Sequence, residues 1–261
     1  MRKLYFLWFI VMLACFSCEW HLRPTEHSQG SLIGLERYDQ IEALFLTTGD
    51  VAALHQMNTD YPDQTRMLIE NLLQIGHVDD AEINSRFFHY YQDTTLQTII
   101  KDVKHQYEDL SDIEQALSES FARLQTLIPE ITIPKFYTQI SSLDQSIVVY
   151  DGCLGISLDK YLGSDYPIYI KYGYSERQRK TMTRSYIVPD CLSFYLLSLY
   201  PIAEGLDTVR AIRDKHMGRI QYIVNKVLND KKFQNEFVLA TESYMKQHPN
   251  VSIVDLLEQK D

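Results

Sequence analysis

The stretch Ser-Ile-Val-Val-Tyr-Asp-Gly-Cys-Leu-Gly-Ile-Ser-Leu, residues 146–158, decides the fold class of this 261-residue chain. Asp151-Gly152 is a strong signal for a two-residue hairpin turn. The β-branched and apolar residues around it predict strands at 146–150 and 153–158. Residues 134–141 alternate and include Phe136, Tyr137 and Ile140, which predicts a further strand. Together, these segments predict a small antiparallel meander of three strands.

Helical patterns surround the predicted sheet. Residues 94–107 and 111–128 carry apolar residues at spacings of three and four. Thr94 or Thr95 can cap the first helix, and Ser111 with Glu114 fits a capping box for the second. The short link between them predicts an antiparallel helix pair. The pattern returns in segments 190–200, 207–227 and 231–246. The sequence therefore predicts an α+β fold, mostly α-helical, with one small sheet packed against helices.

The N-terminus has the pattern of a lipoprotein signal peptide. Arg2 and Lys3 precede an uncharged run over residues 4–13, which is shorter than the roughly 20 residues that a membrane-spanning helix needs. Small residues, Ala14 and Ser17, each stand directly before a cysteine. A small residue before cysteine is the lipobox arrangement, in which the cysteine is acylated after cleavage.

Two cysteines are alternative lipidation sites. Cys15 fits the lipobox better because apolar residues fill the two positions before Ala14, whereas Cys18 is followed directly by acidic Glu19. An uncleaved helical anchor and an ordinary signal peptide are the alternatives. We therefore expect a signal peptide and lipidation site at 1–18, a flexible tether at 19–34 and a single domain at 35–261.

The composition of the chain excludes some classes of binding partner. The net charge is -10 and no long basic stretch occurs, which argues against nucleic acid and against electrostatic binding to an anionic bilayer. We expect an exported protein anchored to the cell envelope, at the inner or the outer membrane. Its expected partners are the lipid bilayer, through N-terminal acyl groups, and other envelope proteins.

No catalytic or metal-binding motif stands out, so we expect no cofactor, no metal and no catalytic residue. The eight histidines include no pair at His-x-x-x-His spacing. His216 lies on an apolar helix stripe, which favours a hydrogen-bonded core residue. Cys153 and Cys191 could pair, although two buried free thiols are the favoured interpretation. Asp151, Asp159 and Asp165 could bind calcium, but we interpret them as residues that shape turns. Glu204 and Asp207 could be catalytic, but we interpret them as residues that stabilise the start of a helix.

A tyrosine-rich stretch is the candidate binding surface. Amphipathic aromatics are enriched at interface hot spots, although packing over the sheet would need the same residues. The five candidates are Tyr161, Tyr166, Tyr169, Tyr172 and Tyr174.

The chain resembles the gliding motility lipoprotein GldB family. The resemblance rests on segments 133–137, 146–149 and 155–163, the last reading Gly-Ile-Ser-Leu-Asp-Lys-Tyr-Leu-Gly. The lipobox, the tether, Arg37-Tyr38-Asp39 and segment 214–222 are also similar. The resemblance implies an envelope lipoprotein associated with gliding motility or secretion.

The same resemblance implies a zincin-like scaffold, in which a helix with His-Glu-x-x-His packs beneath a small sheet. The corresponding segment here is His-Met-Gly-Arg-Ile, residues 216–220, which lacks the glutamate base and the second histidine. Zinc hydrolysis needs three protein ligands and a general base. We therefore expect a non-catalytic lipoprotein that binds or supports envelope proteins. The alternative is a divergent zincin-like metallopeptidase.

Overall fold

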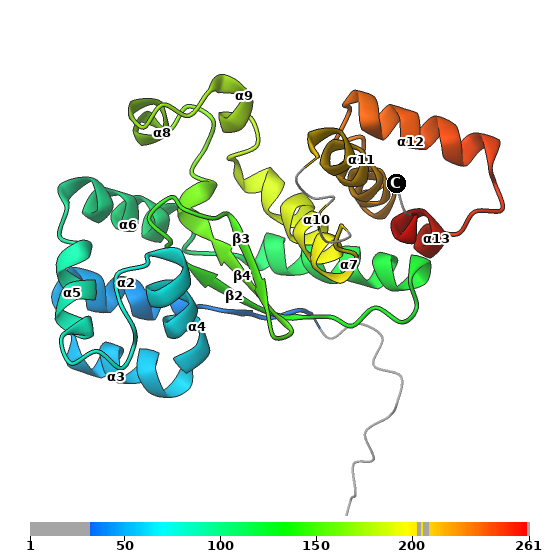
Figure 1. Cartoon of the computed structure of the whole chain (residues 1–261). Coiled ribbons are helices and arrows are strands. Elements are labelled where there is room, and N and C mark those ends of the chain that lie inside the picture. Colours follow the sequence, from blue (N-terminus) through cyan, green and yellow to red (C-terminus); the bar gives the residue numbers. More distant parts are fainter. Residues whose placement is uncertain (1–31, 203–204, 206–208, 260–261) are drawn as a thin grey trace, which may run out of the picture. The chain divides into compact units, whose positions relative to one another are not determined.

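The computed structural model describes residues 32–202, 205 and 209–259 (Figure 1). Cys15 and Cys18, most of the expected tether, and Glu204 and Asp207 lie outside these residues. Within the described part, no helix combines the length and the apolar character needed to cross a membrane. The elements in chain order are β1 (Leu35–Glu36), α2 (Tyr38–Thr48), α3 (Val51–Asp60), α4 (Pro62–Arg66), a π-helical turn (Met67–Leu72), α5 (Ile83–Tyr90), α6 (Thr94–Gln106), α7 (Ser111–Leu127), β2 (Lys135–Gln139), β3 (Ile147–Tyr150), β4 (Cys153–Ser157), α8 (Pro167–Lys171), α9 (Glu176–Arg179), α10 (Ile187–Leu199), α11 (Arg210–Leu228), α12 (Glu236–Gln247) and α13 (Ile253–Glu258).

The sheet confirms the hairpin but corrects the predicted meander. It has four strands in the order β1-β2-β4-β3, and only β3 runs antiparallel to its neighbour. Asp151 and Gly152 both have positive φ, 41° and 72°, as a tight hairpin turn requires. The prediction of three antiparallel strands was wrong because the link after β2 carries the chain to the far edge. The hairpin then returns β4 between β3 and β2, parallel to β2.

Asp159 fixes that link. Its carboxylate is fully buried and accepts hydrogen bonds from the backbone N–H groups of Ser141, at 3.0 Å, and Leu143, at 2.6 Å. Ser142 and Leu143 have φ of 57° and 65°, a region that costs free energy for residues other than glycine. A residue just after β4 thus holds the strained turn that follows β2, which keeps the ends of the two strands together.

The faces of β2 meet different helices. Phe136 packs against Phe121 of α7, with ring centroids 5.3 Å apart. On the other face, the ring centroid of Tyr137 lies 6.3 Å from that of Tyr38 in α2, and the Tyr137 ring covers Gly155 of β4. A Cβ atom at Gly155 would lie 2.4 Å from the Tyr137 ring, so only glycine fits beneath it. The sheet is therefore covered on both faces: α7 packs on β2 and α10 on β3 and β4 on one side, and α2 packs on β2 on the other (Figure 1).

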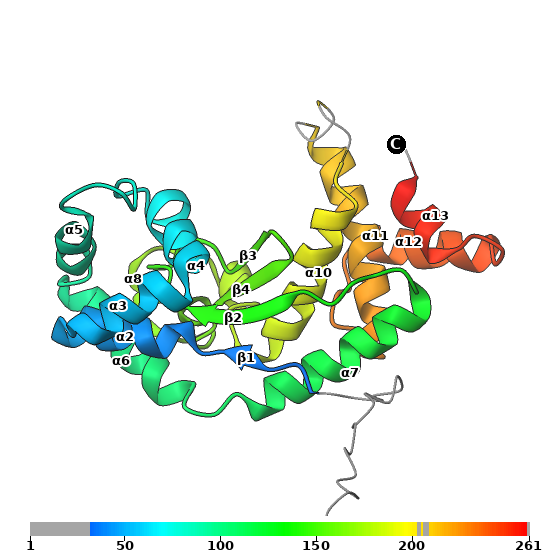
Figure 2. The same cartoon turned by 90° about the horizontal axis from the view of Figure 1, so that it is seen from below.

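Helices α6 and α7 form as predicted but are not an antiparallel pair. They follow one another end to end, as Figure 2 shows. Arg37 donates to the carbonyl oxygens of Tyr107 and Glu108 in the link between them, and Arg184 donates to those of Gln106 and Asp109. These two arginines satisfy carbonyl groups that the end of α6 leaves unpaired.

The caps of these helices also differ from the prediction. Asp93, one residue before the expected threonines, caps α6 by accepting from the N–H groups of Thr95 and Leu96. The predicted capping box on α7 is absent, because the Glu114 carboxylate accepts from the N–H of Leu35 at 2.9 Å instead. Glu114 thereby ties the start of β1 to α7, a tertiary contact that the local sequence does not indicate.

Candidate functional site

The five tyrosines of the candidate surface do not share one environment. Tyr161 and Tyr169 are almost fully buried, so neither can form a binding surface in this structure. Tyr169 donates to the carbonyl oxygen of Asp159 and accepts from the N–H of Leu162. Tyr161 donates to Asp190 at 2.8 Å. For these two residues, the burial and the hydrogen bonds fit a packing role.

The other three tyrosines lie nearer to the solvent. Tyr166 and Tyr174 are half-buried and donate to Asp102 and to the carbonyl oxygen of Leu143, respectively. Tyr172, which follows α8, is 56% exposed. The accessible part of the candidate surface is therefore Tyr172 with the edges of its two neighbours, and its binding role stays a prediction.

The three aspartates near the hairpin serve separate loops. Asp151 forms the hairpin turn, Asp159 holds the link after β2, and Asp165 is exposed with an Arg179 contact at 4.0 Å. Among the described residues, no group of three or more histidine, cysteine or acidic side chains is arranged to hold a metal ion. The positions of these aspartates fit the turn-shaping interpretation.

His216 is a hydrogen-bonded core residue, as predicted. It is 4% exposed, and its Nε2 lies 2.7 Å from the carbonyl oxygen of Tyr200. Its helix, α11, packs against α7, α10, α12 and α13. A zincin-like arrangement would place this helix beneath the sheet, so these contacts give that expectation no support.

Cys153 and Cys191 are free thiols. Cys191 is buried in α10, as expected, whereas Cys153 at the start of β4 is only half-buried. Next to Cys191, burial raises the pKa of the Asp190 carboxyl to about 7, although the Tyr161 hydroxyl donates to it. This carboxyl therefore changes charge near neutral pH.

Sequence reasoning missed a group of buried carboxylates where β2 and β4 end. Glu42 of α2 is fully buried and accepts from the N–H of Ile140 at 2.9 Å, while its Oε1 has no hydrogen-bond partner. Burial, with repulsion from Asp159 and Asp39, raises the pKa of Glu42 well above its usual range. Asp39 accepts from the Thr138 hydroxyl. The ends of parallel strands are usually surrounded by apolar residues, so β2 and β4 give no sign that carboxylates lie beside them. The one available signal is the spacing of three between Asp39 and Glu42, which places both on the same side of α2.

Arg37 connects this buried group to the surface. Its guanidinium donates to both oxygens of Asp39, each at 2.8 Å, and to the Tyr107 carbonyl oxygen at 2.8 Å. This bidentate geometry fixes both side chains. The Arg37-Tyr38-Asp39 segment, noted in the sequence for its family resemblance, therefore joins α2 to the end of α6.

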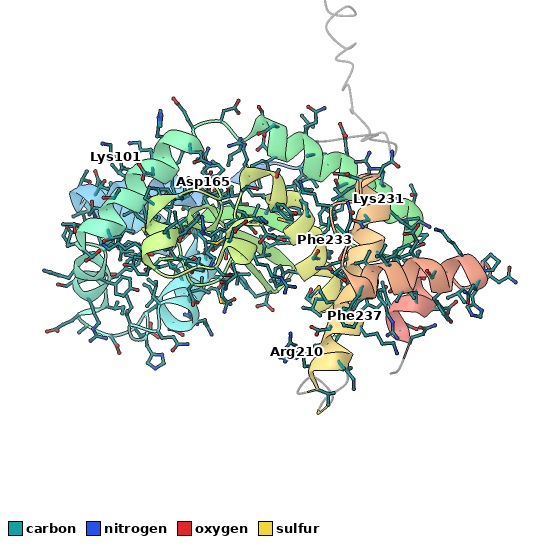
Figure 3. All side chains as sticks on the ribbon, turned by 90° about the horizontal axis from the view of Figure 1, so that it is seen from above. Lys101, Asp165, Arg210, Lys231, Phe233 and Phe237 are labelled. Atoms are coloured by element: carbon teal, nitrogen blue, oxygen red, sulfur yellow. The ribbon has the colours of Figure 1, made fainter. Side chains whose placement is uncertain are left out.

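A pocket of about 620 Å³ lies beside this pair, between α2 and α6. Its lining includes the apolar residues Ala43, Leu44 and Ile140, here called the floor, and basic side chains from one side of α6. The volume falls within the range of ligand pockets, roughly 300–1,000 Å³. We take this pocket, here called the α2–α6 pocket, as the candidate functional site. Figure 3 shows Lys101, one of these basic residues, on α6.

Comparison with known proteins gives one result. The family model described as gliding motility protein GldB matches residues 26–238, which includes every strand and the helices from α2 to α11. No curated protein and no solved structure matches the chain significantly.

Proposed function

The chain belongs to the gliding motility protein GldB family, and from this membership we propose that it is a membrane-anchored envelope lipoprotein without catalytic activity. Its role would be to bind or support other envelope proteins of a gliding motility or secretion-associated assembly. The observation that carries the proposal is the match over residues 26–238, which takes in the buried carboxylates and the α2–α6 pocket.

The anchor in this proposal is lipid on Cys15 or Cys18. The basic residues, the short apolar run and the small residue before each cysteine support export and acylation at the inner or the outer membrane. Two or more acyl chains would hold the folded unit at the membrane surface, because each buried methylene contributes about 0.8 kcal/mol.

The non-catalytic part of the proposal is supported by how the polar side chains are used. His216 is bound to a backbone carbonyl, and Arg37 is paired with Asp39. Each group is held by structural contacts. The alternative, a divergent zincin-like metallopeptidase, would need His216 to leave Tyr200 and ligate zinc.

Mass spectrometry of the mature N-terminus tests the anchor. We expect an acylated N-terminal cysteine, lost in either Cys15→Ala or Cys18→Ala and retained in the other variant. An unmodified N-terminus that begins elsewhere would contradict the lipoprotein assignment. Metal analysis of the same protein tests the alternative: stoichiometric zinc that disappears in His216→Ala would favour the metallopeptidase.

A pull-down from detergent-solubilised envelopes tests the supporting role. Recovery of the same envelope proteins with the acylated chain, and not with a chain that lacks both cysteines, is the expected result. Repeated recovery of no protein would count against a binding role.

A further inference from the structure

We infer that the α2–α6 pocket binds an acidic segment of a partner protein, with an apolar side chain against Leu44 and carboxylates on the basic side chains of α6. This inference rests on the proposed function, because it gives the chemistry of the envelope partner that such a function requires. The pocket offers both components side by side, one from each helix.

The charged component consists of Lys101, Lys104 and His105. Their spacing of three and four residues places them on one side of α6, and all three are exposed and line the pocket. None of the ion pairs formed within the described residues includes any of them. A cluster of unpaired bases in a chain of net charge -10 is complementary to an acidic ligand.

The apolar component lies on α2. Leu44 is 47% exposed although the adjacent Ala43 and Ile140 are buried. An apolar side chain that covered Leu44 would remove this surface from water, at about 25 cal/mol per Å². The floor therefore favours a ligand with hydrocarbon side chains next to its charges.

The wall of the pocket at Arg37 is held in place before any ligand binds. Arg37 is fixed by Asp39 and by the carbonyl oxygens of Tyr107 and Glu108. Because Arg37 and Asp39 neutralise each other, the exposed Glu108 carboxylate is the remaining negative charge among the pocket's lining residues. A fixed wall reduces the entropy that binding would otherwise cost.

A phosphate group or a lipid headgroup fits this pocket less well. The basic residues lie in the C-terminal half of α6, which lacks the free backbone N–H groups with which a helix N-terminus binds phosphate. Arg37, which could bind phosphate with two parallel hydrogen bonds, is already paired. Separate lysines above an apolar floor suit carboxylates spread along a peptide.

Photo-crosslinking in intact envelopes tests the inference with the full-length chain. Benzoylphenylalanine replaces Leu44 in one chain and exposed Tyr172, outside the pocket, in a second. Each is combined with Lys101→Glu/Lys104→Glu, or with the control Lys135→Glu/Lys231→Glu, which changes the net charge equally at exposed lysines outside the pocket. Figure 3 shows that Lys231 lies well away from Lys101, on the opposite side of the view.

The expected adduct at position 44 maps to a protein segment rich in aspartate and glutamate. The yield of this adduct falls about tenfold in Lys101→Glu/Lys104→Glu, because two attractive charges become repulsive. A tenfold fall corresponds to a loss of about 1.4 kcal/mol of binding free energy. The yield is unchanged in the control. The inference is overturned by an adduct with phospholipid, by an adduct with a basic or uncharged segment, or by a yield that charge reversal leaves unchanged. An adduct at position 172 alone also overturns it while leaving the proposed function standing. No adduct at either position counts against both.

Discussion

Three carboxyl groups, Glu42 and Asp159 buried and Asp190 half-buried, show how single residues shape this protein. Asp159 is satisfied by two backbone N–H groups, Asp190 by one tyrosine hydroxyl, and Glu42 by one N–H with its second oxygen unpartnered. Burial raises the pKa of all three. A buried carboxylate with few hydrogen bonds favours its protonated form, so Glu42 and Asp190 make the stability of the fold dependent on pH.

Asp190→Asn should change that dependence. Because the folded-state pKa of Asp190, about 7, lies above its unfolded value, its contribution to stability is complete below about pH 4. The contribution is then lost progressively as pH rises to 7 and beyond. The asparagine keeps an oxygen for Tyr161 and carries no charge. Relative to the unchanged chain, its denaturation midpoint should rise as the pH goes from about 5 to 8.

The control is Asp79→Asn, at an exposed aspartate for which no hydrogen bond or ion pair is found. Its midpoint should follow the unchanged chain at every pH. If Asp190→Asn also ran parallel to the unchanged chain across this range, the ionisation of Asp190 would not be linked to folding.

At the scale of elements, the link between β2 and β3 decides the sheet. The sequence predicts β2, β3 and β4 but not the two-residue β1, and the turn chemistry of Asp151-Gly152 predicts the hairpin. The position of β4 beside β2 depends on Asp159, which belongs to the segment after β4 but binds Ser141 and Leu143 after β2. Strand order was therefore set by a contact between residues 16 and 18 positions apart.

Asp159→Asn should destabilise the fold by about 1–3 kcal/mol, because one of its two N–H partners would then face an amide N–H₂ instead of an oxygen. Chemical denaturation followed by circular dichroism measures the change. Asp144→Asn, an exposed position in the same link, provides the comparison and should alter stability by less than about 0.5 kcal/mol. Equal effects of the two substitutions would show that the buried contacts do not hold the link.

At the scale of the whole described unit, one apolar core joins the sheet to most of the helices between α2 and α13. Tyr38, Phe136 and Ile220, from α2, β2 and α11, all belong to it. Elements that share a core lose their packing together when it is exposed to water.

Thermal unfolding should therefore be a single transition. Far-ultraviolet circular dichroism reports the helices, and near-ultraviolet circular dichroism reports the packed tyrosines. Trp8 and Trp20, the two tryptophans of the chain, lie outside the described residues, so tyrosine is the chosen reporter. The two midpoints should coincide. A separate early transition in one signal would show that part of the unit unfolds independently.

The sequence by itself determined the elements and the family. Hairpin chemistry, helical spacing and the Gly155–Gly163 segment act through neighbours in the chain, and they predicted the mostly helical α+β class and the GldB resemblance. The core role of His216 followed from its apolar helix stripe in the same way. Tertiary structure alone decided the parallel pairing of β2 and β4, the burial of Tyr161 and Tyr169, and the pairing of Arg37 with the end of α6. These features depend on contacts between distant residues, and local periodicity contains no information on which distant partner a side chain meets.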